Sequence, residues 1–300
     1  LMQSFQQILE NFSQVLTYGG HSFTYRFLNN RWRNYSDADC FSSEDTADLT
    51  LFQSVRQLDI QKDISPFRHL LSLENTRKAT AEAFIRYIRP EHLDPEALVK
   101  CYTSWELSKE DTLLLQLKSH HEADMIGLLH LHSLSAYTQF FRGRFAKVHL
   151  CRLEENFCHL ALILETPVPQ RFQLSNALLS LSLEKDTAHL VIPVLSGELK
   201  YFLPGPVKDY YYLPKEDRAI HRSIACYVDK AYRQKATAAT CYIRQEGIFL
   251  PSFDTSLQPT FRKSFDDKQL YILCDTEKLT SDPAFLRSYI SSLIKEVASV

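Results

Sequence analysis

Apolar residues recur along the first half of the chain with the period of an α-helix. Phe5, Ile8 and Phe12 begin this pattern close to the first residue. Strands are expected at residues 14–18 and 54–60, helices at 22–32 and in a run between 67 and 141, and a polar loop at 35–48. This order of strands and helices predicts an α/β domain over residues 1–145.

Beyond residue 145, apolar residues alternate with polar ones, which is the period of a sheet with one solvated face. Leu179, Leu181 and Leu183, for example, alternate with serines. Strands are expected at residues 146–153, 159–166, 177–184 and 188–195, and helices at about 215–234 and 283–298. We therefore expect a second domain over residues 146–300, an α+β domain with an antiparallel sheet.

Composition narrows the range of partners. The 300 residues carry a formal net charge of −2, so no overall positive field attracts the protein to nucleic acid or to an acidic membrane. A polyanionic partner must therefore contact a local basic patch or bound metal ions. Seven cysteines without a C-x-x-C pair argue against a disulfide framework and favour free thiols in a reducing compartment. No apolar run reaches the roughly 20 residues of a membrane span, so we expect a cytoplasmic protein with no membrane partner.

The expected helix between residues 110 and 141 places a histidine and a carboxylate on an apolar stripe. The stripe consists of Leu113, Leu117, His120, Asp124, Leu128 and Leu131. One interpretation is a structural pair, in which His120 and Asp124 satisfy each other across one turn. The other is that Asp124 binds a divalent metal while His120 acts as a general base. Because a hard cation needs several oxygen ligands, the second interpretation requires further carboxylates.

Several stretches of the sequence carry a family resemblance. The segment TYGGHSFTYRFL (17–28) resembles the second motif of the DnaQ-like 3′–5′ exonucleases, and Asp124 with His120 four residues before it resembles their third motif. The subfamily that the chain resembles is that of the bacterial ribonuclease H-like domain-containing proteins, exonucleases with a β-rich C-terminal extension. The blocks that carry this second resemblance are LDIQKDISPFRHLLSLENTRKATAEAF (58–84) and ELKYFLPGPVKDYYYLPKEDRAIHRSIACYVDKAYRQKATAATCYIR (198–244).

The resemblance implies an RNase H-like fold and a metal-dependent exonuclease mechanism. In that family, four carboxylates hold two Mg²⁺ or Mn²⁺ ions, which activate water against the 3′ end of single-stranded nucleic acid. Carried over residue by residue, the resemblance makes Asp124 a metal ligand and His120 the general base. Asp59, at the end of an expected strand, is a weaker candidate for a second metal ligand.

The sequence departs from the family at the other ligand positions. Thr24 stands where the second motif has its Asp, and Gly19 stands where that motif has Asn. A hydroxyl is a neutral ligand and holds a second cation poorly. The Asp-x-Glu of the first motif is missing, so we expect either that strands carrying it lie upstream of Leu1 or that the site has degenerated. Both explanations predict little or no nuclease activity.

Two non-catalytic functions are compatible with the same sequence. The first is nucleic-acid binding by basic residues on the helix expected at 215–234, beside a tyrosine run at 210–212 that could stack bases. The basic residues are Arg218, Arg222, Lys230 and Arg233. Glu216, Asp217 and Asp229 share that helix, so an ordinary solvated face is the competing interpretation. The second function is protein interaction, in which a partner strand covers an exposed sheet edge.

Overall fold

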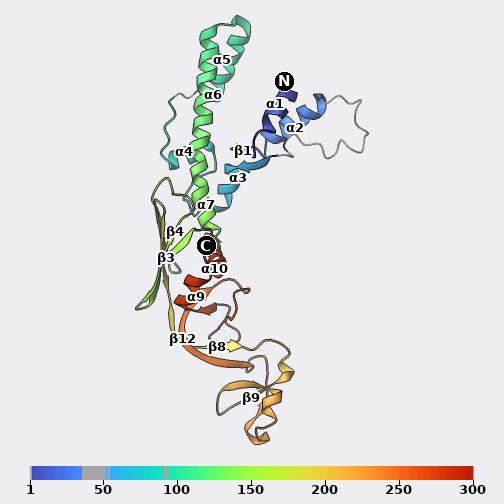
Figure 1. Cartoon of the computed structure of the whole chain (residues 1–300), viewed down its shortest axis with the longest axis vertical. Helices are drawn as coiled ribbons and strands as arrows, with labels where there is room; N and C mark the ends of the chain where they lie inside the picture. Colours follow the sequence, from blue (N-terminus) through green and yellow to red (C-terminus); the bar gives the residue numbers. More distant parts are fainter. Residues whose placement is uncertain (1, 36–51, 53–54, 91–92, 300) are drawn as a thin grey trace. The chain divides into compact units, whose positions relative to one another are not determined.

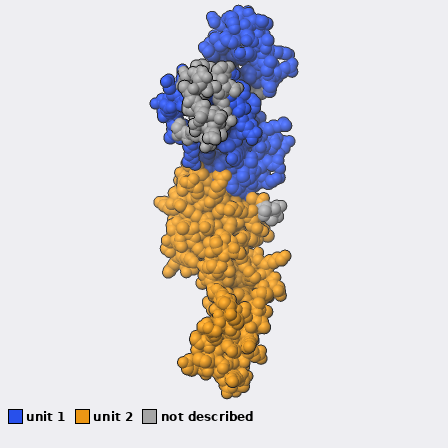
Figure 2. All heavy atoms as spheres, turned by 90° about the vertical axis from the view of Figure 1, so that its right-hand side faces the viewer, with its two compact units in different colours: residues 1–138 blue, residues 139–300 orange. Residues whose placement is uncertain are grey.

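The computed structural model describes residues 2–35, 52, 55–90 and 93–299. The chain divides into two compact units, residues 1–138 and 139–300, which are coloured separately in Figure 2. The division lies a few residues before the boundary expected from the change of hydrophobic pattern. Among these described residues, no helix is both long enough and apolar enough to cross a membrane.

The first unit is mostly helical and contains two short strands (Figure 1). Its elements in chain order are α1 (Met2–Leu9), β1 (Gln14–Thr17), α2 (Thr24–Tyr35), β2 (Arg56–Asp59), α3 (Ile60–Ile64), η3 (Ser65–Phe67), α4 (Lys78–Phe84), α5 (Pro95–Ser108), α6 (Asp111–Leu131), η4 (His132–Leu134) and α7 (Ser135–Phe141). Both expected strands are confirmed, as is the helix after the first of them. The loop expected at 35–48 falls almost entirely outside the described residues.

β1 and β2 pair in parallel, with Gln14 opposite Arg56 and Thr17 opposite Asp59. Because parallel strands share a direction, their carboxyl ends lie at the same edge, and Asp59 ends β2 next to the loop that leaves β1. A small core fixes the two helices beside this pair. It consists of Leu9, Tyr25, Phe52 and Val55, with Phe5, Val15, Leu28 and Trp32 packed against them. Of the first apolar residues of the helical pattern, Phe5 packs against this core, whereas Ile8 and Phe12 are 55% and 58% exposed, so the pattern predicted the packed face only in part.

α6 carries the apolar stripe on which the histidine and the carboxylate were found. Leu117, His120 and Leu131 are buried, so this part of the expected stripe is confirmed. The single helix expected between residues 110 and 141 is interrupted, because α6 gives way to the 3₁₀ turn η4 before α7 begins. Asp124 remains partly exposed near the middle of α6.

The second unit consists of antiparallel sheets followed by helices at its C-terminal end (Figure 1). Its elements are β3 (Lys147–Glu154), β4 (Phe157–Ile163), β5 (Phe172–Ser175), β6 (Ser180–Glu184), β7 (Thr187–Pro193), β8 (Leu195–Phe202), η5 (Val207–Asp209), β9 (Tyr210–Leu213), β10 (Arg218–His221), α8 (Arg222–Ala225), η6 (Lys230–Tyr232), β11 (Gln234–Lys235), β12 (Tyr242–Ser252), β13 (Leu270–Leu273), α9 (Thr276–Ser281) and α10 (Pro283–Ser299). The expected C-terminal helix is thus confirmed.

The largest sheet of the second unit has the strand order β3-β4-β7-β6-β5. All its neighbouring strands are antiparallel, as the alternating pattern predicted. Leu179, Leu181 and Leu183 are buried, so the apolar half of the alternation faces the core. α9 packs against β3 of this sheet, and α10 packs against β12 of the neighbouring sheet β13-β12-β8.

The prediction of a helix at 215–234 is wrong. The segment instead forms strand β10, the single turn α8 and the 3₁₀ turn η6. Backbone pairing decides this outcome, because β10 pairs with β9 in an antiparallel hairpin whose turn holds Asp217 at φ +48°. Ile224 and Tyr227, which an α-helix would place on one apolar face, are 58% and 90% exposed. The apparent helical period arises from a hairpin followed by one helical turn.

Candidate functional site

Asp124 on α6 forms ion pairs with two basic side chains. Lys78 Nζ lies 2.7 Å from Asp124 Oδ1, and Arg89 Nη1 lies 2.8 Å from the same oxygen. Partial burial acts to raise the pKa of Asp124, but the hydrogen bonds and charges of Lys78 and Arg89 outweigh it and hold the pKa below its ordinary value. Asp124 is therefore ionised at neutral pH, and 41% of its side chain is exposed.

Arg89 joins Asp124 to a second, more deeply buried carboxylate. The guanidinium donates to both oxygens of Glu82, with Nε–Oε2 and Nη2–Oε1 distances of 2.9 and 2.7 Å. Glu82 belongs to α4 and is 5% exposed. The hydrogen bond to Glu82 is the main reason that the pKa of Arg89 is raised. We call Lys78, Glu82, Arg89 and Asp124 the charge cluster; its two acids and two bases leave no net charge.

His120 is buried on α6, one turn before Asp124. Its Nδ1 lies 3.4 Å from the backbone nitrogen of Leu93 and accepts its hydrogen. Its ring meets that of His121 edge to face, with centroids 5.9 Å apart. Because Nδ1 accepts, the proton of the neutral ring is on Nε2. The role of general base stays a prediction.

The carboxylate of Asp59, the second candidate ligand, accepts hydrogen bonds from several backbone N–H groups. These donors are the N–H groups of Gly19, His21 and Gln61, at 2.8, 2.9 and 3.1 Å. His21 Nδ1 also lies 3.3 Å from Oδ2. Burial acts to raise the pKa of Asp59, but these hydrogen bonds dominate and lower it. The carboxylate caps α3 and ties the loop after β1 to the end of β2.

The two positions that depart from the exonuclease motif follow β1. Gly19 has φ +74°, a conformation that glycine adopts at little cost. A Cβ at Gly19 would lie 2.8 Å from Gln61 Oε1, so local geometry accounts for the glycine. Thr24 is the first residue of α2 and is exposed. Its hydroxyl is the only polar group that the side chain offers at the position where the motif has a carboxylate.

Two exposed aromatic rings flank Thr24 at the start of α2. Phe23 and Phe27 are 70% and 48% exposed, and their rings stack with centroids 5.7 Å apart and planes 12° apart. The Arg31 guanidinium lies 6.0 Å from the centroid of Phe27. Four-residue spacing places these residues on one face of the helix. We call Phe23 and Phe27 the aromatic platform; the sequence pattern did not reveal it, because exposure cannot be read from a motif.

The described residues do not fit a two-metal centre. Within residues 2–35, 52, 55–90 and 93–299, no three His, Cys, Asp or Glu side chains gather to hold a metal ion. A two-metal centre needs several carboxylates around two cations about 4 Å apart. Asp59 and Asp124 instead belong to different hydrogen-bond networks. Their roles as metal ligands stay predictions.

The basic residues expected to bind nucleic acid lie in the second unit, around the small sheet β10-β9-β11. Arg218 Nη2 is 2.6 Å from Glu216 Oε2, and Arg222 Nη1 is 3.2 Å from Asp209 Oδ1. Lys230 is exposed in η6. Two of these cations are therefore paired with neighbouring acids, and no continuous helix aligns the set into one face.

Arg233 and the tyrosine run pack within the same small sheet. The Arg233 guanidinium donates to the Ala225 carbonyl and lies 5.1 Å from the centroid of Tyr211. The hydroxyl of Tyr210 donates to the Pro204 carbonyl at 2.9 Å. All three tyrosines of β9 are half-buried, which supports a packing role for them.

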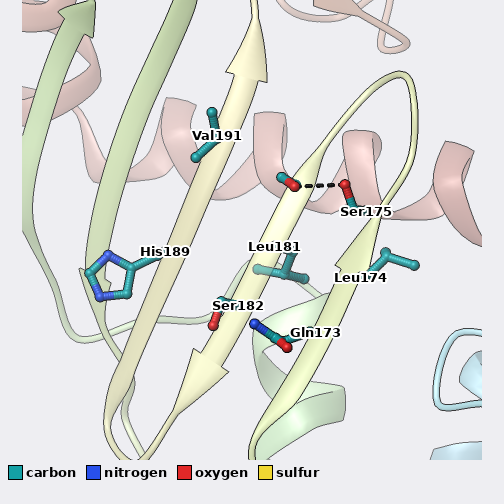
Figure 3. Close-up of a pocket in the computed structure, with 8 residues that line it drawn as sticks. Gln173, Leu174, Ser175, Leu181, Ser182, His189 and Val191 are labelled. Carbon is teal, nitrogen blue, oxygen red and sulfur yellow. Dashed lines mark hydrogen bonds between the residues drawn. The ribbon is translucent and has the colours of Figure 1, made fainter.

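A shallow hollow of about 380 Å³ lies on β5, β6 and β7 of the five-stranded sheet (Figure 3). Gln173, Ser182 and His189 form one cross-strand row along it. The hydroxyls of Ser175 and Ser180 are 2.8 Å apart in the next row. None of the predicted site residues lines this hollow, and it holds no lysine or arginine to contact a phosphate.

The charge cluster is the part of the site that sequence reasoning missed. Asp124 was found from its helix, but Lys78 and Arg89 come from α4 and from the connection after it. Arg89 was not among the candidate residues. No spacing rule connects residues so far apart in sequence, so the ion pairs could be found only in three dimensions.

Comparison with known proteins gives one match. Residues 1–135 match the family model described as the RNase_H superfamily. No curated protein and no solved structure matches the chain. The matched residues include both parallel strands, the aromatic platform and the charge cluster. The DnaQ-like exonuclease subfamily stays a prediction. The N-terminal part of the chain therefore carries an RNase H-like domain.

Proposed function

We propose that the N-terminal unit binds the 3′ end of single-stranded nucleic acid and has the fold of a metal-dependent 3′–5′ exonuclease. We further propose that its own phosphodiester hydrolysis is weak or absent. The observation that carries the proposal is the exposed aromatic platform beside Thr24, within a domain whose superfamily acts on nucleic acid.

The aromatic platform has the chemistry of a base-stacking surface. Every base presents a π face, and stacking on an aromatic side chain contributes about 1–3 kcal/mol per base. Phe23 and Phe27 expose enough ring surface for this contact. Arg31 places a positive charge beside the platform, where a phosphate or a base can meet it. Local contacts of this kind are needed because the chain carries a net charge of −2.

The charge cluster explains why hydrolysis is expected to be weak. Lys78 and Arg89 both contact Oδ1 of Asp124, so a divalent cation must compete with two fixed positive charges. The cluster as a whole is neutral and creates little negative potential to attract such a cation. Thr24 adds a hydroxyl and no charge. The family mechanism needs several ionised carboxylates at this place.

A trimming assay tests the hydrolytic part of the proposal. We expect 5′-labelled single-stranded DNA and RNA to be trimmed no faster with Mn²⁺ than with EDTA, because the charge cluster disfavours metal binding. Asp124→Asn is expected to give the same low rate. Glu122→Gln is the matched control, since Glu122 is an exposed carboxylate two residues earlier on α6.

Trimming that depends on both Mn²⁺ and Asp124 is the result that would contradict weak hydrolysis. Trimming that requires Mn²⁺, disappears in Asp124→Asn and persists in Glu122→Gln would establish a working metal centre at Asp124. That outcome would contradict weak hydrolysis while leaving nucleic-acid binding in place. Trimming that is unchanged in Asp124→Asn does not arise at this carboxylate.

A further inference from the structure

A pocket of about 550 Å³ lies in the second unit, where β8 meets the segment that connects β12 to β13. Its volume is within the range of about 300–1,000 Å³ that is usual for small-molecule sites. The aromatic and polar side chains that line it are Tyr201, Phe202, Gln258, Thr260, Arg262 and Phe265. No site residue predicted from the sequence is among them, so we call it the aromatic pocket and consider it by itself.

Three aromatic rings form the apolar part of the aromatic pocket. Tyr201 packs against the small buried core of the sheet β13-β12-β8. Phe202 meets Phe265 edge to face, with ring centroids 5.6 Å apart. Phe265 is 43% exposed, so part of its ring surface is open to a ligand. Such surfaces favour a planar, unsaturated ring, which can stack on them.

Arg262 is the one charged residue among the described residues that line the aromatic pocket. Its backbone is fixed, because Arg262 and Lys200 exchange N–H to carbonyl hydrogen bonds of 3.0 and 2.9 Å. Nη1 donates to the Phe265 carbonyl at 3.4 Å, a long contact that uses one of the five N–H donors of the guanidinium. Within the described ranges, no carboxylate forms an ion pair with Arg262. A guanidinium with open donors is suited to hold a phosphate through two parallel hydrogen bonds.

Positive charge is concentrated beside the aromatic pocket. Lys200 lies opposite Arg244 on one side and opposite Arg262 on the other, and residues directly opposite each other project from the same face of a sheet. Arg244 is paired with Glu198 and Asp217. Across the part of the chain that the structure describes, no carboxylate pairs with Lys200. Because like charges at opposite positions repel, an anion bound at Arg262 also relieves the repulsion from Lys200.

Two polar side chains of the aromatic pocket offer hydrogen bonds to the edge of a ring. Gln258 Nε2 donates to the Thr255 carbonyl at 2.8 Å, which leaves Oε1 as an acceptor for a ligand. Thr260 contributes a hydroxyl, which can donate or accept. Asp266 and Asp267 follow Phe265 in the chain, but neither lines the pocket. The lining therefore combines ring surfaces, an acceptor for an amino group and a cation for an anionic group.

We propose that the aromatic pocket binds a nucleotide, with the base stacked on Phe202 and Phe265 and the phosphate held by Arg262. Stacking accepts any base, because each base has a π face, whereas the amide oxygen of Gln258 favours a base that carries an amino group. A free mononucleotide and the terminal nucleotide of a strand present the same base and phosphate. The pocket lies in the second unit, so the proposal does not rest on the function proposed for the first.

Titration calorimetry of the full chain with adenosine 5′-monophosphate tests the proposal. We expect Arg262→Met to weaken binding about 10- to 150-fold, since it removes hydrogen bonds from a charged group. Phe265→Ala is expected to weaken it about 5- to 150-fold through the loss of a stacking surface. Lys263→Met is the matched control and is expected to bind like the wild type, because Lys263 is exposed beside Arg262 in the chain and does not line the pocket.

Changes in the ligand test the same contacts without relying on a variant. Adenosine lacks the phosphate, so it is expected to bind more weakly than the monophosphate and equally to the wild type and Arg262→Met. A 5′-phosphorylated oligonucleotide, titrated into the Phe23→Ala chain to weaken the aromatic platform, identifies a strand end as the ligand if it displaces the monophosphate; otherwise the ligand is the free nucleotide. No binding of the monophosphate to the wild type, equal affinity in Arg262→Met, or equally tight binding of inorganic phosphate would overturn the proposal.

Discussion

Replacing Arg89 with methionine is expected to destabilise the first unit by about 3–5 kcal/mol, because the change leaves a buried carboxylate without its cation. Glu82 is 5% exposed and receives both of its strong hydrogen bonds from Arg89. Methionine retains the apolar stem, so the loss reports the charge rather than packing. Both tryptophans, Trp32 and Trp105, lie in the first unit, so tryptophan fluorescence during urea unfolding measures the effect there.

Lys78→Met is the matched control for this prediction. Lys78 Nζ contacts the partly exposed carboxylate of Asp124 and also donates to the Asp124 backbone carbonyl at 3.1 Å. A partly exposed ion pair of that kind contributes about 1 kcal/mol or less. The two variants remove one positive charge each from the same cluster. Equal destabilisation by both would contradict the assignment of Glu82 as the buried acid that depends on Arg89.

The second large effect is expected at Gly143, which lies just after the end of α7 and has φ +79°. A Cβ there would lie 2.2 Å from the carbonyl oxygen of Arg287 in α10, and a backbone atom inside a helix cannot move away cheaply. Gly143→Ala therefore combines a strained backbone with an overpacked contact, which together cost about 2–4 kcal/mol. Unfolding of the second unit followed by circular dichroism measures the loss.

Gly205→Ala separates the two contributions. Gly205 has φ +93°, but a Cβ at that position would meet nothing within 4 Å. This variant therefore carries the backbone cost alone, about 1 kcal/mol. If Gly143→Ala and Gly205→Ala destabilised the protein equally, the close contact with Arg287 would have no energetic consequence.

The pattern of hydrophobic and polar residues predicted those helices and strands that depend mainly on residues close together in the sequence. The alternation of Leu179, Leu181 and Leu183 follows directly from a sheet with one buried face, and the structure has that sheet. The strands β1 and β2 were likewise predicted from two short runs of residues, whereas their parallel pairing is seen only in the structure. The helix predicted at 215–234 does not form, because β10 pairs with β9 and this pairing satisfies backbone hydrogen bonds that a helix would otherwise make.

The candidate site could be predicted only in part, for a related reason. Asp124 was identified from its place on a helix, but its partners Lys78 and Arg89 are set by packing between distant segments. Asp59 was identified at a strand end, yet its backbone donors come from a loop after another strand. The residues that carry charge are visible in a sequence, and the contacts that determine what the charge does are not.

Nucleic-acid binding by the aromatic platform is the central claim, and its most direct test is the affinity for a labelled single-stranded oligonucleotide in EDTA. The chains compared by fluorescence anisotropy are the wild type, Phe23→Ala, Phe27→Ala and Leu129→Ala. Leu129 is a matched control because it is 69% exposed on α6, away from the platform in sequence.

We predict that each platform variant weakens binding about 5- to 150-fold, as expected for the loss of one stacked base, and that Leu129→Ala binds like the wild type. Wild-type affinity is also expected to fall as salt rises. Equal affinity of all four chains, or no binding by the wild type at low salt, would contradict the account.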